Sequence, residues 1–147
     1  MRLVRYGGAM SLDGYIAGPN GEHDWIVMDP DIDFAALMKQ FDTFLIGRKT
    51  FEAMLRMGSD MTATPGIQSI VFSRTLDPAA YPHLTVKSDA ERVVADLRGR
   101  PGKDIALFGG GVPLLPPPAG RATLKLRQQR LYEKTGTVGL EYDIVRS

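Results

Sequence analysis

Short apolar runs alternate along this chain with segments of helical periodicity, and this alternation limits the possible folds more than any other feature. The apolar runs are too short for helices, and several of them end at glycine or at turn residues. Strands are predicted at residues 2–9, 43–46, 68–72, 84–86 and 104–108, and helices at 31–40, 50–57 and 90–98. The alternation indicates an α/β fold, with a mostly parallel sheet flanked by helices.

The C-terminal segment follows a different pattern. Residues 123–132 and 138–145 are both strand-like, and the second run alternates strictly between apolar and other side chains. Lys134, Thr135 and Gly136 lie between the two runs. We therefore expect the chain to close with an antiparallel hairpin.

Length and composition restrict the class of protein. The 147 residues, 44% of them hydrophobic, suit one domain spanning 1–147, and no apolar run reaches the roughly 20 residues that cross a bilayer. A net charge of +1 with mixed signs argues against a nucleic-acid partner, and no membrane partner and no metal site are expected. The chain has no cysteine and begins without an export signal, so a cytoplasmic location is predicted.

A triple glycine, Gly109-Gly110-Gly111, directly follows the run 105–108. Glycines at a strand end let backbone N–H groups approach a phosphate closely. The partner of such a turn is normally a helix N-terminus, but here Val112 and a proline-rich stretch follow. The sequence thus contains half of a phosphate site.

The turn Gly47-Arg48-Lys49-Thr50 separates a predicted strand from a predicted helix. Its two cations beside a helix N-terminus suit an anion, and Thr50 can cap the helix or bind phosphate. An exposed basic turn with an ordinary cap explains the same four residues equally well. From these residues alone, neither interpretation is favoured.

Ser73 and Arg74 end another predicted strand. Ligands of open α/β sheets collect at the carboxyl ends of strands, so these residues, Arg48 and the glycines at 109–111 are expected to face one cleft. Glycine amides suit a pyrophosphate, and two arginines suit an additional phosphate monoester. NADPH is therefore favoured over NADH, although a phosphorylated sugar fits the same groups.

Four motifs occur in the order that is typical of one superfamily, at residues 11–17 (SLDGYIA), 47–52 (GRKTFE), 70–74 (IVFSR) and 107–111 (LFGGG). Together with the closing hairpin, they make nearly the whole chain resemble the dihydrofolate reductase-like superfamily. The resemblance is closer to the reductase domain of the bacterial bifunctional riboflavin-biosynthesis deaminase/reductase and its stand-alone homologues. It implies a mixed, mainly parallel sheet flanked by helices.

The resemblance also implies an activity. It predicts an NADPH-dependent reductase of the 5-amino-6-(5-phosphoribosylamino)uracil reductase type, which transfers a hydride to a pyrimidine- or pteridine-like molecule. A homodimer is also expected, because of the exposed strand edges described below. Two alternatives stay open: dihydrofolate reductase activity, and an inactive remnant that binds a ligand or another copy of itself. The cofactor-binding positions that the resemblance implies are Ala9, Ile16, Gly47, Arg48, Lys49, Thr50, Ser73, Arg74, Phe108, Gly109, Gly110 and Gly111.

The candidates for catalysis are fewer than those for cofactor binding, because hydride transfer mainly requires that the protein position the cofactor against the substrate and exclude water. Dihydrofolate reductases carry an acidic residue on the first helix, where Asp31 and Asp33 are the nearest candidates here, but a role as helix caps is favoured for both. Asp13, in a loop that borders the substrate in this superfamily, ranks ahead of them. Trp25, the single tryptophan, either shields substrate or completes the core, and both Asp13 and Trp25 are substrate-binding candidates.

The chain departs from the superfamily after Gly111. Relatives continue with a helix, a central strand and a second glycine-rich turn, so an internal deletion near 111–112 is predicted. A genuine deletion and a sequence that omits residues would look identical. The lost strand would lie between the first strand and the hairpin, and its absence would expose strand edges on both sides. We expect the hairpin either to pair directly with the strand at 2–9 or to exchange with a second chain.

Overall fold

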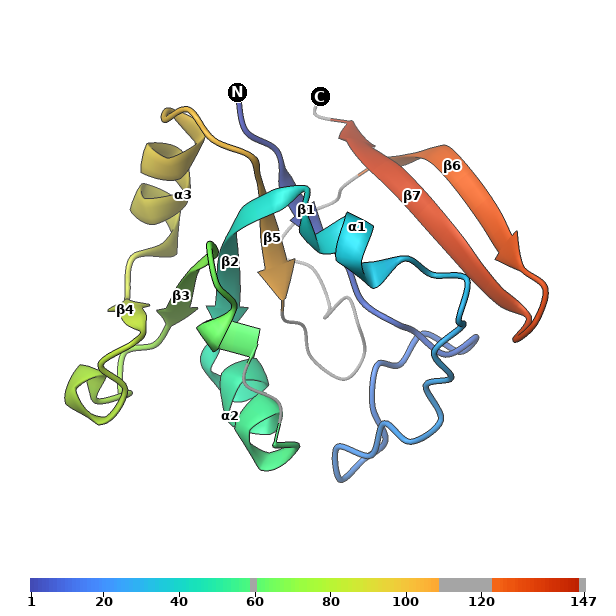
Figure 1. Cartoon of the computed structure of the whole chain (residues 1–147), viewed down its shortest axis with the longest axis horizontal. Coiled ribbons are helices and arrows are strands. Elements are labelled where there is room, and N and C mark those ends of the chain that lie inside the picture. Colours follow the sequence, from blue (N-terminus) through green and yellow to red (C-terminus); the bar gives the residue numbers. More distant parts are fainter. Residues whose placement is uncertain (59–60, 109–122, 146–147) are drawn as a thin grey trace.

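Five parallel strands form the central sheet of the protein, seen in a computed structural model that describes residues 1–58, 61–108 and 123–145 (Figure 1). Their spatial order is β1-β5-β2-β3-β4. The strands are β1 (Val4–Tyr6), β2 (Phe41–Gly47), β3 (Gln68–Phe72), β4 (Thr85–Lys87) and β5 (Asp104–Phe108). The predicted α/β class with a parallel sheet is confirmed.

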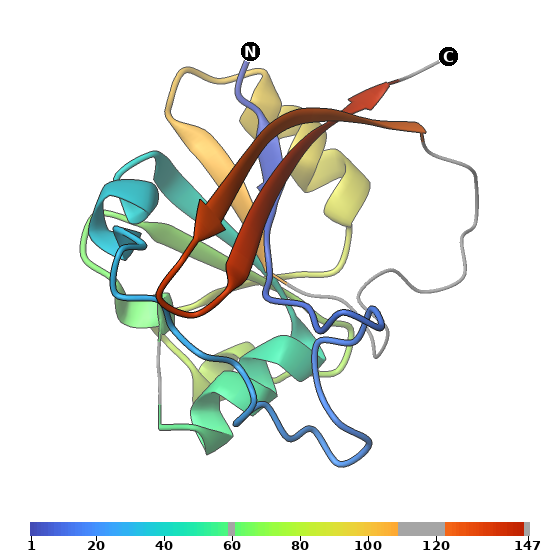
Figure 2. The same ribbon diagram turned by 90° about the vertical axis from the view of Figure 1, so that its right-hand side faces the viewer.

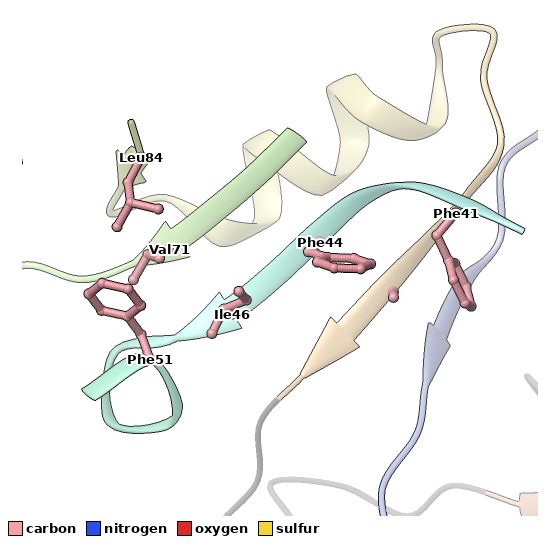
Figure 3. Packing of buried hydrophobic residues seen from close by; sticks show 7 residues of the cluster. Phe41, Phe44, Ile46, Phe51, Val71 and Leu84 are labelled. Atoms are coloured by element: carbon pink, nitrogen blue, oxygen red, sulfur yellow. The ribbon is translucent and has the colours of Figure 1, made fainter. Parts of the chain in front are cut away.

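Helices cover both faces of this sheet. α2 (Arg48–Arg56) places Phe51 in a core with Phe44, Ile46 and Val71 (Figure 3). α1 (Phe34–Met38) adds Met38 to the same core. On the other face, α3 (Ala90–Arg98) packs Leu97 against a second core cluster of Leu45, Ile70 and Ile105. Two short 3-10 helices, η1 (Met61–Ala63) and η2 (Pro78–Ala80), flank β3. Strands buried on both faces explain why the runs read as continuous apolar sequence.

A buried arginine fixes the start of β1. Arg2 is 7% exposed; its Nε donates to the carbonyl of Lys103 at 2.5 Å and its Nη2 donates to Thr43 Oγ1 at 2.9 Å. The same Nη2 forms an ion pair with Asp42, whose other oxygen accepts the Lys103 N–H at 2.8 Å. The network ties the N-terminus to both β2 and the turn before β5.

β6 (Thr123–Tyr132) and β7 (Thr137–Val145) form the expected antiparallel hairpin. It is a separate two-stranded sheet on the β1 side of the molecule (Figures 1 and 2). Direct pairing of the hairpin with the first strand, one of the two expected arrangements, is therefore wrong for this chain. Exchange with a second chain stays a prediction, and residues 109–122, which include the predicted deletion, lie outside the described part of the chain.

Several element bounds differ from the sequence-based expectation by one or two residues, and two elements are much shorter than predicted. The helix predicted at 31–40 is limited to α1, and Phe41, whose spacing from Phe34 suits a helix, instead starts β2 opposite Asp104. The strand predicted at 2–9 is limited to β1, after which Gly7 and Gly8 begin a loop that runs to α1. In both places, parallel pairing with β5 sets the boundary. No helix in the described ranges is long and apolar enough to span a membrane.

Candidate cofactor and substrate site

The carboxyl ends of the strands lie in one row across the sheet. Tyr6 is in register with Leu107, Ile46 with Phe108, and Gly47 with Phe72. The segments that follow these ends therefore share one edge, as the sequence predicted. This is the edge at which open α/β sheets bind ligands.

The first turn of α2 stands at the middle of this edge. Gly47 caps the helix in extended conformation without a side-chain hydrogen bond, so the helix begins directly where β2 ends. Amides of a first helical turn have no partner within the helix, and they attract anions. Arg48 Nη1 donates to Glu52 Oε1 at 2.8 Å in a half-exposed (i, i+4) ion pair, which fixes the arginine beside the turn.

A polar cavity of about 320 Å³ lies on one side of this turn. Ser73 orders its floor, because Ser73 Oγ accepts the N–H groups of Thr75 at 3.1 Å and Leu76 at 2.9 Å. Arg74 is exposed, and within the described chain its guanidinium has no hydrogen-bonding partner. The cavity is lined by Arg48, Phe72, Ser73, Arg74, Thr75 and Ser88. It offers two guanidinium groups and three hydroxyls to an anion.

A mainly apolar cavity of about 200 Å³ lies on the other side, over the ends of β1 and β5. Phe108 lines this cavity and makes an edge-to-face contact with the buried Phe44, with ring centroids 5.0 Å apart. Burial raises the pKa of the Tyr6 hydroxyl, so this lining residue is neutral at physiological pH. The lining residues are Tyr6, Gly7, Gly8, Ala9, Ile16, Ile26, Thr50, Met54 and Phe108. Such a cavity suits a flat ring.

Seven of the predicted cofactor residues line the two cavities: Ala9, Ile16, Arg48, Thr50, Ser73, Arg74 and Phe108. Gly47 lies between the cavities as the α2 cap, whereas Lys49 is exposed and lines neither of them. Gly109, Gly110 and Gly111 lie outside the described residues. Sequence reasoning missed Gly7 and Gly8, although a glycine pair directly after a strand was a usable signal.

The residues predicted for catalysis and substrate binding lie in the loop between β1 and α1 and at the start of α1. Asp13 is exposed and accepts a 2.5 Å hydrogen bond from Ser11 Oγ, within a turn closed by the Ser11 N–H and the Tyr15 carbonyl. Asp33 caps α1 by accepting the Ala36 N–H at 2.8 Å, which is the role favoured from the sequence. Trp25 is 38% exposed. None of these three lines either cavity, so their chemical roles stay predictions.

The end of this loop is held by the hairpin. Asp29 is 2% exposed; it accepts the Thr135 hydroxyl at 2.6 Å and the Asp31 N–H at 2.9 Å, while Lys134 Nζ contacts Asp31 Oδ1 at 2.6 Å. The Thr135 hydroxyl lowers the pKa of the Asp29 carboxyl; burial opposes this, and the Asp31 N–H and the Lys134 charge add to the lowering. The carboxylate is therefore a structural anchor that joins the loop to the hairpin tip.

Acid is expected to release the hairpin. A carboxyl whose pKa is lower in the folded state stabilises that state above its ordinary pKa of 3.8, and this stabilisation is lost as the pH falls below that value. Amide hydrogen exchange in β6 and β7, measured between about pH 6 and about pH 3 and corrected for intrinsic rates, should show protection that decreases more in the wild-type chain than in Asp29→Asn. Asp24→Asn, an exposed change of the same kind, should follow the wild type. Equal losses in the wild type and Asp29→Asn would refute the anchor.

Comparison with known proteins identifies the family. The RibD C-terminal domain profile matches residues 2–113, which contain all five strands of the sheet and the residues of both cavities. The chain belongs to the RibD C-terminal domain family.

A curated relative is consistent with this family assignment. The uncharacterised protein YyaP of Bacillus subtilis (strain 168) is 36% identical over 112 residues, which are 69% of this chain, and the match spans 60% of the YyaP length.

Solved structures share the fold at low sequence identity. A candidate riboflavin biosynthesis protein of Shewanella sp. PV-4 superposes with a TM-score of 0.79 at 21% identity, covering 99% of this chain and 100% of the other. The Thermotoga maritima diaminohydroxyphosphoribosylaminopyrimidine deaminase/5-amino-6-(5-phosphoribosylamino)uracil reductase gives 0.70 at 15% identity, covering 98% of this chain and 57% of that protein. A pyrimidine reductase-like protein of Corynebacterium diphtheriae gives 0.61 at 12% identity, covering 99% and 93%. The dihydrofolate reductase-like fold expected from the sequence is confirmed.

Among the described residues, no group of three or more His, Cys, Asp or Glu side chains is arranged to hold a metal ion.

Proposed function

We propose that this chain binds NADPH across the carboxyl edge of its sheet and transfers a hydride from it to a pyrimidine- or pteridine-like heterocycle. The observation that carries this proposal is the position of the α2 N-terminus between a cationic cavity and an apolar one. An elongated ligand with phosphates at one end and a flat ring at the other matches this order. A phosphorylated sugar, the alternative weighed from the sequence, would leave the apolar cavity unused.

The cationic cavity suits the adenosine 2′-phosphate. Arginine binds phosphate with two parallel hydrogen bonds, and Arg74 has its guanidinium available within the described chain. Ser73 and Ser88 add hydroxyl groups at the same cavity. NADH lacks the phosphate that these groups would bind.

The apolar cavity suits the nicotinamide ring. Gly7 and Gly8 put no side chain into it, so a ring can approach the backbone, while Ala9, Ile16 and Phe108 supply apolar surface. When bound, NADPH would supply a hydride to an electrophilic C=N or C=O carbon of the substrate, and one proton would complete the reduction. The protein residues orient the two rings and exclude water. Asp13 and Trp25, in the loop that borders this cavity, are the residues that we propose contact substrate, with Asp13 and Asp33 as the candidate acids.

The substrate class is proposed from the relatives. One structural relative is named as a 5-amino-6-(5-phosphoribosylamino)uracil reductase and another as pyrimidine reductase-like, and both share this fold. A ribosylaminopyrimidine is therefore the first substrate to test. Oxidation of NADPH should depend on this compound and be much slower with dihydrofolate. Faster turnover of dihydrofolate would favour the alternative reductase activity, and turnover of neither compound would favour a non-catalytic ligand-binding protein.

Replacing Arg74 with alanine should reduce the preference for NADPH. A charged hydrogen-bonding group contributes about 1.5–3 kcal/mol, so NADPH binding should weaken by roughly 10- to 100-fold while NADH binding changes little. Fluorescence titration of Trp25 with each cofactor measures both affinities. Arg56→Ala, an exposed arginine at the other end of α2, is the matched control and should leave both unchanged. Equal weakening of NADPH and NADH by Arg74→Ala would contradict a phosphate-binding role.

A further inference from the structure

The loop between β1 and α1 is strongly acidic. Residues 7–33 contain six carboxylates and neither lysine nor arginine, the six being Asp13, Glu22, Asp24, Asp29, Asp31 and Asp33. An ion pair with Lys134 compensates one of them, Asp31. The same loop supplies five of the nine residues that line the apolar cavity. The negative charge therefore lies on the segment that borders this cavity.

Two of these carboxylates are fixed by hydrogen bonds from uncharged groups. Asp13, three residues before the lining residue Ile16, accepts from Ser11 Oγ at 2.5 Å. Glu22 accepts from the Asn20 side chain at 2.7 Å, and this hydrogen bond lowers the pKa of the Glu22 carboxyl. An uncharged donor holds a carboxylate in place without neutralising it, so the loop keeps its charge at physiological pH.

The cations at the sheet lie away from the apolar cavity. Arg48 and Arg74 line the cationic cavity, on the other side of the first turn of α2. Arg5, which precedes the lining residue Tyr6, forms an ion pair of 2.6 Å with Asp104, where β5 begins at the opposite edge of the sheet. Among the described residues, those that line the apolar cavity carry no charged side chain. The site therefore has arginines at one end and a carboxylate-rich loop at the other.

We propose that the substrate of this site is an uncharged or positively charged heterocycle that carries no phosphate or carboxylate group. The inference rests on the proposed function, which puts the nicotinamide ring in the apolar cavity and the substrate between this ring and the loop. An anionic group there would lie beside carboxylates of its own sign, and like charges repel more strongly where water is excluded. The cofactor avoids this repulsion, because its phosphates would lie at the arginines of the cationic cavity.

One pair of compounds separates the two substrate classes. 5-Amino-6-(5-phosphoribosylamino)uracil, the compound in the name of the Thermotoga maritima relative, differs from its dephosphorylated form by a single phosphate. At about 50 mM salt, NADPH oxidation should give a kcat/KM at least about tenfold higher for the dephosphorylated compound. Raising the salt to about 500 mM should reduce this preference, because screening shortens the range of charge repulsion. An equal or higher kcat/KM for the phosphorylated compound would overturn the inference and leave the NADPH proposal standing.

A charge-neutralising double variant tests the role of the loop. Glu22→Gln with Asp24→Asn removes two exposed carboxylates and keeps the size of both side chains. It should raise kcat/KM for the phosphorylated compound several-fold and change that for the dephosphorylated compound little. Glu91→Gln with Asp96→Asn, at two exposed carboxylates of α3 on the face of the sheet opposite α2, is the matched control and should change neither value. Equal effects of the two double variants would refute a role for the charge of the loop.

The fluorescence of Trp25 measures the charge of the loop without a substrate. This single tryptophan lies between Asp24 and the lining residue Ile26 and is 38% exposed, so ionic quenchers reach it. At equal ionic strength, the ratio of caesium to iodide quenching should be higher for Trp25 than for N-acetyltryptophanamide, and Glu22→Gln with Asp24→Asn should lower it. A ratio no higher than that of the free compound would overturn the inference. The measurement involves no cofactor, so its failure is distinguishable from a failure of NADPH binding.

Discussion

Replacing Phe44 with alanine is expected to cost about 3–5 kcal/mol of the free energy of unfolding. Phe44 lies at the centre of β2 (Figure 3) and is fully buried. Its ring packs edge to face on Phe108. The truncation leaves a cavity that parallel strands on both sides prevent from collapsing. Because Phe108 lines the apolar cavity, the same change should also weaken cofactor binding in the molecules that remain folded.

Urea denaturation monitored by circular dichroism measures this loss. Phe34→Ala, the same substitution at a side chain that is 39% exposed, is the control and should cost about 1 kcal/mol or less. Phe44→Leu keeps most of the volume and should be intermediate. If Phe44→Ala cost no more than Phe34→Ala, the packing of β2 against β5 would be wrong.

Removing the Arg2 side chain should be nearly as damaging, at about 3 kcal/mol. Breaking a buried ion pair costs about 3–5 kcal/mol, and the lower value applies because the Asp42 side chain is 32% exposed. Arg2→Ala also leaves the Lys103 carbonyl without its 2.5 Å donor. A Cβ on Gly102 would stand 2.6 Å from Asp42 Oδ2, so Gly102→Ala should disturb the same network without removing a charge.

Arg5→Ala is the matched control for Arg2→Ala. Arg5 is also in the N-terminal segment and pairs with Asp104 at 2.6 Å, but its side chain is 40% exposed. Exposed pairs contribute about 1 kcal/mol or less because solvent screens them. Thermal and urea unfolding should therefore show a clearly larger loss of unfolding free energy for Arg2→Ala than for Arg5→Ala. Equal losses would show that burial of Arg2 has no special role at the N-terminus.

The bounds of a helix or strand could be predicted from the sequence where local residues mark its ends. Asp89 caps α3 by accepting the Arg92 N–H, and Gly99 follows its last residue, so both ends of that helix were predictable. Strands β3 and β5 also have their predicted bounds. The start of β2 was not predictable, because Phe41 suits the helical spacing of its neighbours and only its pairing with β5 places it in a strand.

Site residues could likewise be predicted only where a local pattern in the sequence marks them. Residues that directly follow strands, such as Arg48, Ser73 and Arg74, were identified because the parallel sheet puts strand ends on one edge. Ile26 and Met54 line the apolar cavity but lie in a loop and on a helix face, where only the folded arrangement brings them to it. The anchor between Asp29 and Thr135 joins residues 106 positions apart, and no local pattern indicates it.

In the proposed function, one elongated site at the sheet edge recognises NADPH through its additional phosphate. Isothermal titration calorimetry of the wild-type chain with NADPH and with NADH, at one ionic strength, measures this recognition. We expect saturable binding of NADPH at one site per chain, with NADH at least about tenfold weaker because a charged contact is lost. Equal affinities, or no binding of either cofactor, would contradict it.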